Sequence, residues 1–159
     1  MFTKILSLIL IAGIGLAWPA AETPAQEDSS QIDYQVKIVV SQFVKALLAK
    51  DFESMVNLTE VPFLWDGRGS IKNHEDLKTR FIGRFGKDSG QRMEYEIKDV
   101  HTVEKKQVEE AGNRSELLEV LKEGDRIVEV EVKSKQGGTR IIIMVSRRGG
   151  ETKVIGYKD

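Results

Sequence analysis

One side chain stands out as a candidate for acid–base chemistry in this sequence. Asp66 directly follows the short apolar segment 62–65, which ends in the indole of Trp65. A carboxylate beside an aromatic ring at the end of a strand could act as a general base in a pocket. The same aspartate precedes Gly67, and an aspartate before a glycine commonly forms a turn. The sequence leaves both interpretations of Asp66 open.

The sequence contains two histidines, His74 and His101. His74 stands in the first turn of an expected helix, where exposure to solvent is the usual outcome. His101 follows a strand-like segment and could face either a pocket or solvent. No candidate ligands have the spacing of a metal motif, and the sequence has neither a glycine-rich phosphate loop nor a nucleophile elbow. We therefore expect no metal and no cofactor, with Asp66 and His101 as weak catalytic candidates.

A signal peptide is predicted over residues 1–21. Lys4 is followed by a nearly uninterrupted apolar run over 5–17 and then by Ala20 and Ala21 before position 22. A positive start, a short apolar middle and a small-residue exit are typical of a leader that a peptidase removes on export. A spanning helix needs about 20 apolar residues, so an uncleaved anchor is only the alternative interpretation. We expect a secreted or periplasmic protein with no membrane contact after cleavage.

The rest of the chain has the size of one domain. A flexible linker is expected over 22–30, where apolar periodicity is missing, followed by a single domain over 31–159. Since the sequence contains no cysteine, it has no disulfide and no cysteine for a lipid anchor. The 24 Lys and Arg residues balance the 25 Asp and Glu residues, which argues against a nucleic-acid partner.

Helical periodicity is confined to the first half of this domain. Ser30 and Asp33 have the spacing of a capping box at the start of the first helix. Asp51 is the expected N-cap of a short second helix, and Asn73 that of a third. The apolar stripes that these helices should bury are Val36, Val39, Val40, Phe43, Leu47 and Leu48, then Phe52, Met55 and Leu58, then Leu77, Phe81, Ile82 and Phe85.

The second half has the period of strands. Apolar and polar residues alternate over 93–98 and 128–133, with a phase slip near position 99 that predicts a bulge. The segment 140–146 is apolar on both faces and should be a central strand. Glycine pairs at 137–138 and 149–150 predict antiparallel hairpins. The stretch 104–124 stays open, because a short helix over 115–121 and an extension of the preceding strand over 103–108 are both compatible with it.

Helices followed by consecutive antiparallel strands predict an α+β layer architecture. In this arrangement the segments 43–52, 62–65 and 73–77 and the strands that follow resemble the nuclear transport factor 2-like superfamily, whose cone-shaped fold is shared with ketosteroid isomerases and polyketide-cyclase-like proteins. The resemblance covers most of 31–159. It implies N-terminal helices packed on a curved antiparallel sheet, a cystatin-like roll, with a pocket at the wide end of the cone.

The isomerases of this superfamily provide a test of catalysis. They use a tyrosine of the first helix and a protonated acid on a later strand as oxyanion donors, and a carboxylate near the end of the first short strand as base. The resemblance places the base on or near Asp66, the tyrosine on Phe43, and the strand acid near Ile143 or Met144. Each oxyanion donor lowers a barrier by about 3 to 4 kcal/mol. Because both donors are replaced by hydrocarbon, isomerase chemistry is disfavoured.

The sequence therefore favours a non-catalytic binding protein, whose partner is a small apolar ligand or another protein. One alternative is an isomerase, dehydratase or hydrolase that combines Asp66 with His101 or Tyr95. Another is a dimerisation or scaffold module that forms a homodimer through the outer face of the sheet. The residues expected to line a pocket, which are core residues if there is none, are Phe43, Leu47, Phe63, Trp65, Asp66, Phe81 and Tyr95.

Overall fold

The computed structural model describes residues 28–87, 93–110, 115–135 and 137–159. The predicted signal peptide and nearly all of the predicted linker lie outside these ranges. Within the described ranges, no helix combines the length and the apolar character needed to cross a membrane.

The long first helix, α1 (Ser29–Ala49), begins slightly before the expected start. Its N-cap is Asp28, whose carboxylate accepts a hydrogen bond from the backbone N–H of Ser30 at 3.2 Å. The predicted capping box from Ser30 to Asp33 is therefore wrong. Asp33 instead binds Arg126 of a distant strand, a partner that local spacing cannot reveal. The expected apolar stripe is confirmed, because Val36, Val40 and Phe43 are buried.

The next two helices along the chain begin where the sequence predicts. The side chain of Asp51 accepts a hydrogen bond from the N–H of Ser54 at the start of α2 (Phe52–Asn57). Asn73 does the same for the N–H of Asp76 at the start of α3 (His74–Phe85). Both caps satisfy backbone donors that have no partner inside the helix. Helix α3 buries Leu77 and Phe81, whereas its neighbour Ile82 stays 46% exposed.

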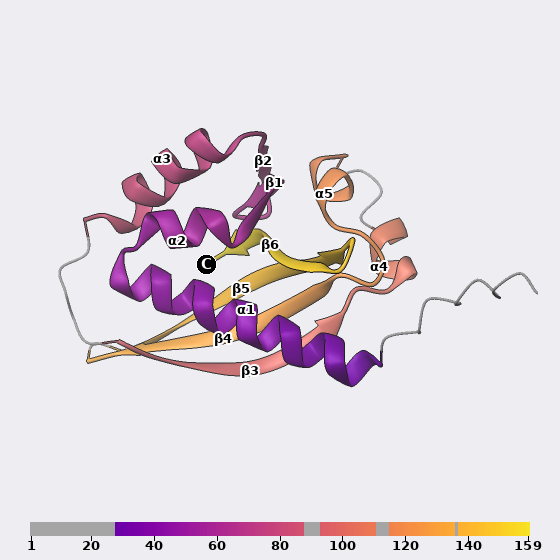
Figure 1. Ribbon diagram of the computed structural model, residues 1–159, viewed down its shortest axis with the longest axis horizontal. Coiled ribbons are helices and arrows are strands. Elements are labelled where there is room, and N and C mark those ends of the chain that lie inside the picture. Colours follow the sequence, from indigo (N-terminus) through magenta and orange to yellow (C-terminus); the bar gives the residue numbers. More distant parts are fainter. Residues whose placement is uncertain (1–27, 88–92, 111–114, 136) are drawn as a thin grey trace, which may run out of the picture.

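Six strands form one twisted sheet (Figure 1). Their order across the sheet is β2-β1-β6-β5-β4-β3. The strands are β1 (Thr59–Trp65), β2 (Gly69–Ile71), β3 (Glu94–Thr102), β4 (Arg126–Ser134), β5 (Gly137–Arg148) and β6 (Glu151–Lys158).

The sheet is mixed rather than purely antiparallel as expected. β1 runs parallel to β6, and the other neighbouring pairs are antiparallel. This pair joins the start of the domain to its last strand, and local patterns carry no information about such a distant neighbour. The other expectations hold: β5 lies inside the sheet, β4–β5 and β5–β6 are hairpins, and β3 has its irregularity between Ile97 and Asp99.

The stretch 104–124, for which the sequence left two interpretations, contains two short helices, α4 (Lys105–Glu110) and α5 (Ser115–Val120). The short helix predicted over 115–121 is confirmed, and it ends at Val120. The strand extension over 103–108 is wrong, since β3 ends at Thr102. The two helices bury Val120, Leu121 and their neighbours against the face of the sheet that α1 does not cover.

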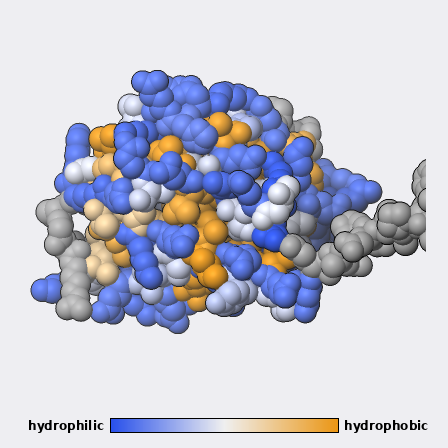
Figure 2. All heavy atoms as spheres, viewed as in Figure 1, coloured by the Kyte–Doolittle hydropathy of each residue, from blue (hydrophilic) through white to orange (hydrophobic). Residues whose placement is uncertain are grey.

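The sheet thus has an inner face under α1 and an outer face under α4 and α5. The inner core joins α1, α2 and α3 to alternate residues of the strands, among them Val128, Val130, Ile141 and Ile143. A smaller cluster with Leu64, Met144 and Ile155 occupies the outer face. On the side that carries α1, hydrophobic residues reach the surface in patches between hydrophilic ones (Figure 2).

Candidate functional site

The inner core is packed with aromatic rings at the positions where a pocket was expected. Phe43, Phe63 and Phe81 each have 0% of their surface exposed. The ring of Phe81 lies 5.9 Å from that of Phe43 and 5.8 Å from that of Phe63, both in edge-on geometry. Such edge-to-face contacts are the favoured packing of aromatic side chains in a core. These three residues therefore fill the interior instead of lining an opening.

Apolar side chains occupy the positions at which the isomerases carry oxyanion donors, which are Phe43 and either Ile143 or Met144. Phe43 and Ile143 belong to the inner core and are fully buried. Met144 follows Ile143 and therefore points to the outer face, because successive side chains of a strand alternate. The interior next to Phe43 and Ile143 offers carbon atoms where a developing negative charge would need donors.

Leu47 packs on the inner core, and Tyr95 borders a separate groove. Leu47 is half-buried against the inner core. The hydroxyl of Tyr95 makes a hydrogen bond with that of Ser41 at 3.1 Å. The ring borders a separate surface groove of about 630 Å³ beside Leu48 and Met93. Tyr95 and the aromatic residues Phe43, Phe63 and Phe81 therefore do not share one pocket.

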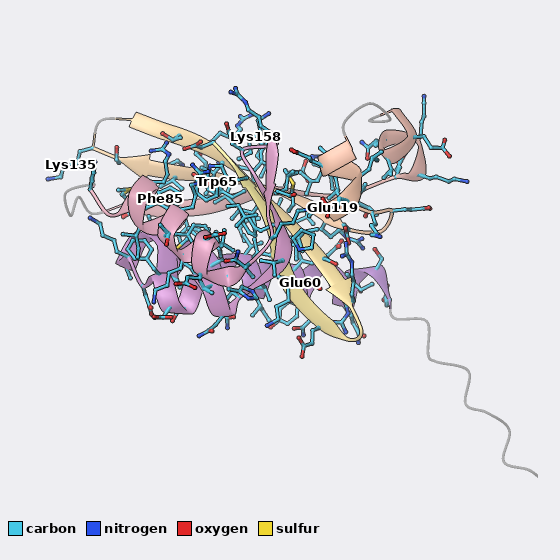
Figure 3. All side chains as sticks on the ribbon, turned by 90° about the horizontal axis from the view of Figure 1, so that it is seen from above. Glu60, Trp65, Phe85, Glu119, Lys135 and Lys158 are labelled. Carbon is cyan, nitrogen blue, oxygen red and sulfur yellow. The ribbon has the colours of Figure 1, made fainter. Side chains whose placement is uncertain are left out.

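Trp65 borders the groove that lies between α3 and β2. Its indole packs on Phe81 and Tyr157, with ring centroids 5.7 and 5.9 Å away. It also packs on Phe85, whose ring centroid is 6.3 Å away (Figure 3). This α3–β2 groove has a volume of about 780 Å³. It is lined by Trp65, Ser70, Ile71, Lys72, Asp76, Thr79, Arg80, Gly83 and Arg84.

The lining of the α3–β2 groove includes three cations, Lys72, Arg80 and Arg84, and one carboxylate, Asp76. Lys72 forms an ion pair with Glu119 of α5, and Arg84 forms one with Asp159. The guanidinium of Arg80 lies over the ring of Trp65, 5.8 Å from its centroid. Among the described residues, no carboxylate lies within ion-pair distance of Arg80. A cation stacked on an indole is a favourable arrangement that leaves the N–H groups of the guanidinium available.

A neutral phenol is buried behind this groove. Tyr157 is 3% exposed and packs against Trp65 and Phe85. Burial, together with the negative charge of the neighbouring Asp159, raises the pKa of the Tyr157 phenol. The nearby guanidinium of Arg84 opposes this shift. The phenol therefore remains protonated at neutral pH and supports the indole from behind.

Asp66 lies on the other side of the sheet from the indole beside it. Its backbone has φ 51°, and its N–H donates to the carbonyl of Tyr157 at 2.8 Å. The carboxylate lies 3.5 Å from the guanidinium of Arg68. Asp66 is thus a turn residue, and its side chain borders an outer-face groove of about 780 Å³. That outer-face groove is lined by Asp66, Gly67, Arg68, Glu116, Leu117, Ile127, Ile142, Met144, Lys158 and Asp159.

His101 is far from Asp66, although both belong to the outer face. Its side chain is 60% exposed, and its Nε2 lies 3.2 Å from the carboxylate of Asp99. A row of paired residues leads from His101 through β4, β5 and β6 to Leu64 of β1. Those four inter-strand steps and the last two residues to Asp66 span roughly 20 Å. A general acid and a general base cannot share one substrate atom over that distance.

The described residues also contain no cluster of three or more His, Asp or Glu side chains arranged to hold a metal ion. His74 is exposed in the first turn of α3, as the sequence predicts.

The outer face of β3 and β4 carries a network of ion pairs. Lys98 lies 2.6 Å from Glu96 and 3.1 Å from Glu131, and Lys133 lies 3.2 Å from each of the same carboxylates. Hydrogen bonds from Lys98 and then Lys133 lower the pKa values of Glu96 and Glu131. The same contacts raise the pKa values of the two lysines. This part of the outer face is therefore charged but locally neutral.

Comparison with known proteins bears on the fold. The sequence matches no family model and no curated protein. Solved structures do match over most of their length. An NTF2-like protein of unknown function from Pseudomonas putida KT2440 is 9% identical, with a TM-score of 0.55, and the match covers 83% of this chain and 87% of that chain. A cystatin-like protein of unknown function from Nostoc punctiforme is 11% identical, with a TM-score of 0.55, and covers 83% and 92%.

A third solved structure shares the fold. A ketosteroid isomerase-like protein from Erwinia carotovora atroseptica is 14% identical, with a TM-score of 0.50, over 79% of this chain and 92% of that chain. The chain has the NTF2-like fold. The expected resemblance and the expected α+β cone are thereby confirmed.

Within this NTF2-like fold, the sequence alone did not reveal the setting of Arg80. Its position near the C-terminal end of α3 indicates only that a cation is favourable there. The signal that was available is the spacing of Arg80 and Arg84, which are one turn apart and next to the buried Phe81. Which ring Arg80 covers depends on how α3 packs on β1.

Proposed function

We propose that this chain is an exported, non-catalytic binding protein that takes a small apolar ligand in the α3–β2 groove. One observation carries the proposal. The aromatic interior is close-packed around Phe81, so that Trp65 is the ring of this cluster that borders a groove. A ligand would then bind at the edge of the core rather than inside the cone.

The non-catalytic part rests on the separation of the ionisable side chains. Asp66 and His101 occupy distant parts of the outer face, and Tyr95 faces the inner side with its hydroxyl on Ser41. Chemistry on a small molecule requires such groups to converge within hydrogen-bond reach of one atom. An enzyme built on Asp66 would have to work at the outer-face groove with Arg68 as its charged neighbour. Steady turnover that Asp66→Asn abolishes would favour that alternative.

The ligand-binding part rests on the size and lining of the α3–β2 groove. Its volume of about 780 Å³ falls in the range of about 300–1,000 Å³ typical of small-molecule sites. Trp65 and Ile71 supply apolar contact, and Thr79 supplies a hydroxyl. The hydroxyl of Ser70 donates to Glu119 of α5 instead. A few polar groups around an apolar surface are what orients a small ligand.

Fluorescence of Trp65 provides a direct test of binding. The sequence contains two tryptophans, Trp18 and Trp65. Trp18 belongs to the predicted leader, so Trp65 is the single indole once the leader is removed, and the variant Trp18→Phe makes it the single indole in a chain that keeps the leader. Titration of this variant with a panel of hydrophobic metabolites should shift or quench its emission for at least one compound. A panel that leaves the emission and the unfolding temperature unchanged would count against the proposal.

Gly83 offers a way to block the α3–β2 groove without disturbing the core. It lies on α3 at the lining, and a Cβ at this position would meet no atom within 4 Å. Gly83→Leu should therefore project into the groove and abolish binding, while helix propensity makes α3 more stable by about 0.8 kcal/mol. Gly83→Ala is the matched control, since its methyl group leaves most of the volume open. Equal binding by both variants would place the ligand elsewhere.

Export is tested separately through the N-terminus. We expect the protein from an extracytoplasmic fraction to have lost the leader that ends near Ala21, because the first 21 residues have the signal-peptide pattern. Intact-mass measurement determines the new N-terminus. Full-length protein retained in the membrane fraction would support the anchor instead.

The outer-face groove favours a second candidate function, association with another protein or a second copy of the chain. Its floor is formed by Leu117, Ile127, Ile142 and Met144, which are apolar, under a charged rim. Light scattering after size-exclusion chromatography measures the oligomeric state of the protein. If this groove is an interface, Ile142→Glu should dissociate the complex, because a charge on the floor would lose its hydration in the complex. A monomer at high concentration would argue against a homodimer.

A further inference from the structure

We propose that the α3–β2 groove recognises a carboxylate, held by Arg80, on a small molecule whose apolar body lies against Trp65. The inference deepens the proposed function and rests on it, because it names the class of ligand for the same groove. A monocarboxylic acid with an aliphatic or aromatic body fits this description.

The charge balance of the groove singles out Arg80. Glu119 neutralises Lys72, and Asp159 neutralises Arg84. Arg80 has its guanidinium over Trp65, and among the described residues it makes neither an ion pair nor a hydrogen bond. Arg80 is thus the cation of the lining that has no ion-pair partner among the described residues, and its guanidinium lies above the ring of Trp65.

The geometry of Arg80 favours a carboxylate. A guanidinium presents parallel N–H groups that match the two oxygens of a carboxylate, and stacking on an indole leaves that edge of the guanidinium open. Contact with the indole restricts the Arg80 side chain, so less side-chain entropy should be lost on binding. A carboxylate on Arg80 would bring the adjoining hydrocarbon next to Trp65 and Ile71, which line the same groove.

Asp76 limits the charge that the ligand can carry. It lies one turn before Arg80 on α3 and also lines the groove. Its carboxylate accepts a hydrogen bond from Asn73 Nδ2 at 2.6 Å, which holds it in place. A dianion such as a phosphate monoester would meet repulsion from Asp76, whereas a monoanion can approach Arg80 from the side of Trp65. The groove is therefore suited to a single carboxylate.

A matched pair of probes separates charge from hydrophobic contact. Octanoate and octanamide have the same aliphatic body and differ in the charge of the head group. In the full chain carrying Trp18→Phe, octanoate should bind about tenfold more tightly than octanamide, as judged by Trp65 fluorescence. High salt should weaken the binding of octanoate and leave that of octanamide nearly unchanged.

Arg80→Met tests the residue itself. It keeps the aliphatic stem beside Trp65 and removes the charge, so octanoate should lose about tenfold in affinity while octanamide keeps its own. Lys87→Met is the control, because it removes an exposed cation just beyond α3 that does not line the groove. Arg80→Lys should give an intermediate affinity, since it retains the charge but not the planar fork.

The outcomes distinguish the two proposals. Equal affinities for octanoate and octanamide, or an Arg80→Met variant that binds octanoate normally, would overturn carboxylate recognition while an apolar ligand site at Trp65 stands. If Lys87→Met weakens the binding of octanoate as much as Arg80→Met does, the effect comes from overall charge and not from Arg80, and carboxylate recognition by Arg80 is overturned. If neither probe nor any other compound reaches Trp65, the proposed function fails together with this inference.

Discussion

Removal of the Phe81 ring should test the packing of the interior most directly. Phe81 is fully buried, and its ring contacts those of Phe43, Phe63, Trp65 and Phe85. Burial of a phenylalanine side chain contributes up to about 3 kcal/mol, and an unrelaxed cavity raises the cost of Phe→Ala to about 3–5 kcal/mol. Because four aromatic partners surround this ring, we expect Phe81→Ala to lower the free energy of unfolding by about 4 kcal/mol.

Urea denaturation followed by circular dichroism measures this loss. Ile82→Ala is the matched control on the same helix, since Ile82 is 46% exposed and should cost less than about 1 kcal/mol. Should Phe81→Ala fail to fold, Phe81→Leu still creates a smaller cavity, with an expected loss of about 1–2 kcal/mol.

The cavity should also acquire a property that the native protein lacks. An engineered apolar cavity of about 150 Å³ stays dry and binds benzene, so benzene should raise the urea midpoint of Phe81→Ala more than that of the native chain. A loss below about 1 kcal/mol for Phe81→Ala, or stabilisation by benzene that is no larger for Phe81→Ala than for the native chain, would refute the close-packed interior. The interior could then hold a substrate, and catalysis inside the cone would no longer be disfavoured.

Three further predictions concern charged and titratable groups. Asp33→Asn should lower stability by roughly 2 kcal/mol in urea denaturation, because it weakens the 2.7 Å contact to Arg126, whose side chain is 7% exposed; an unchanged midpoint would contradict this. The raised pKa of Tyr157 means that its contribution to stability is present below pH 10.0 and is lost above it, so ultraviolet titration should show this phenol ionising later than an ordinary tyrosine. Lysine contacts lower the pKa values of Glu96 and Glu131, so their contribution is present at neutral pH and is lost as the pH falls below 4.5; carboxyl NMR titration in low and high salt should show shifts that salt reduces.

Local patterns were sufficient for most of the elements. Asp51 and Asn73 cap their helices as predicted, since an N-cap depends only on the side chain and the next three residues. The glycines at 149–150 form the β5–β6 turn with φ values of 60° and 85°, which glycine alone adopts without strain. The capping box at Ser30 failed because a better cap, Asp28, lies two residues earlier and Asp33 has a tertiary partner.

The candidate site was predicted in part. The replacement of donors by Phe43 and Ile143 could be inferred from the resemblance, and both side chains lie in the inner core. The grouping of Trp65 with Asp66 was a weaker inference. Trp65 points inward as a strand residue, whereas Asp66 turns with φ 51° toward the outer face. Adjacent residues thus border different grooves.

The sequence by itself determined the types of the elements, their caps, their hairpins and the apolar faces that they had to bury, because these depend on interactions within a few residues. Only the tertiary structure decided that β1 lies parallel to β6, that α4 and α5 cover the outer face, and that Arg80 rests on Trp65. Each of these contacts joins segments that are distant along the chain or that belong to different elements. Their formation depends on shape and charge complementarity across the whole core, which no local period encodes.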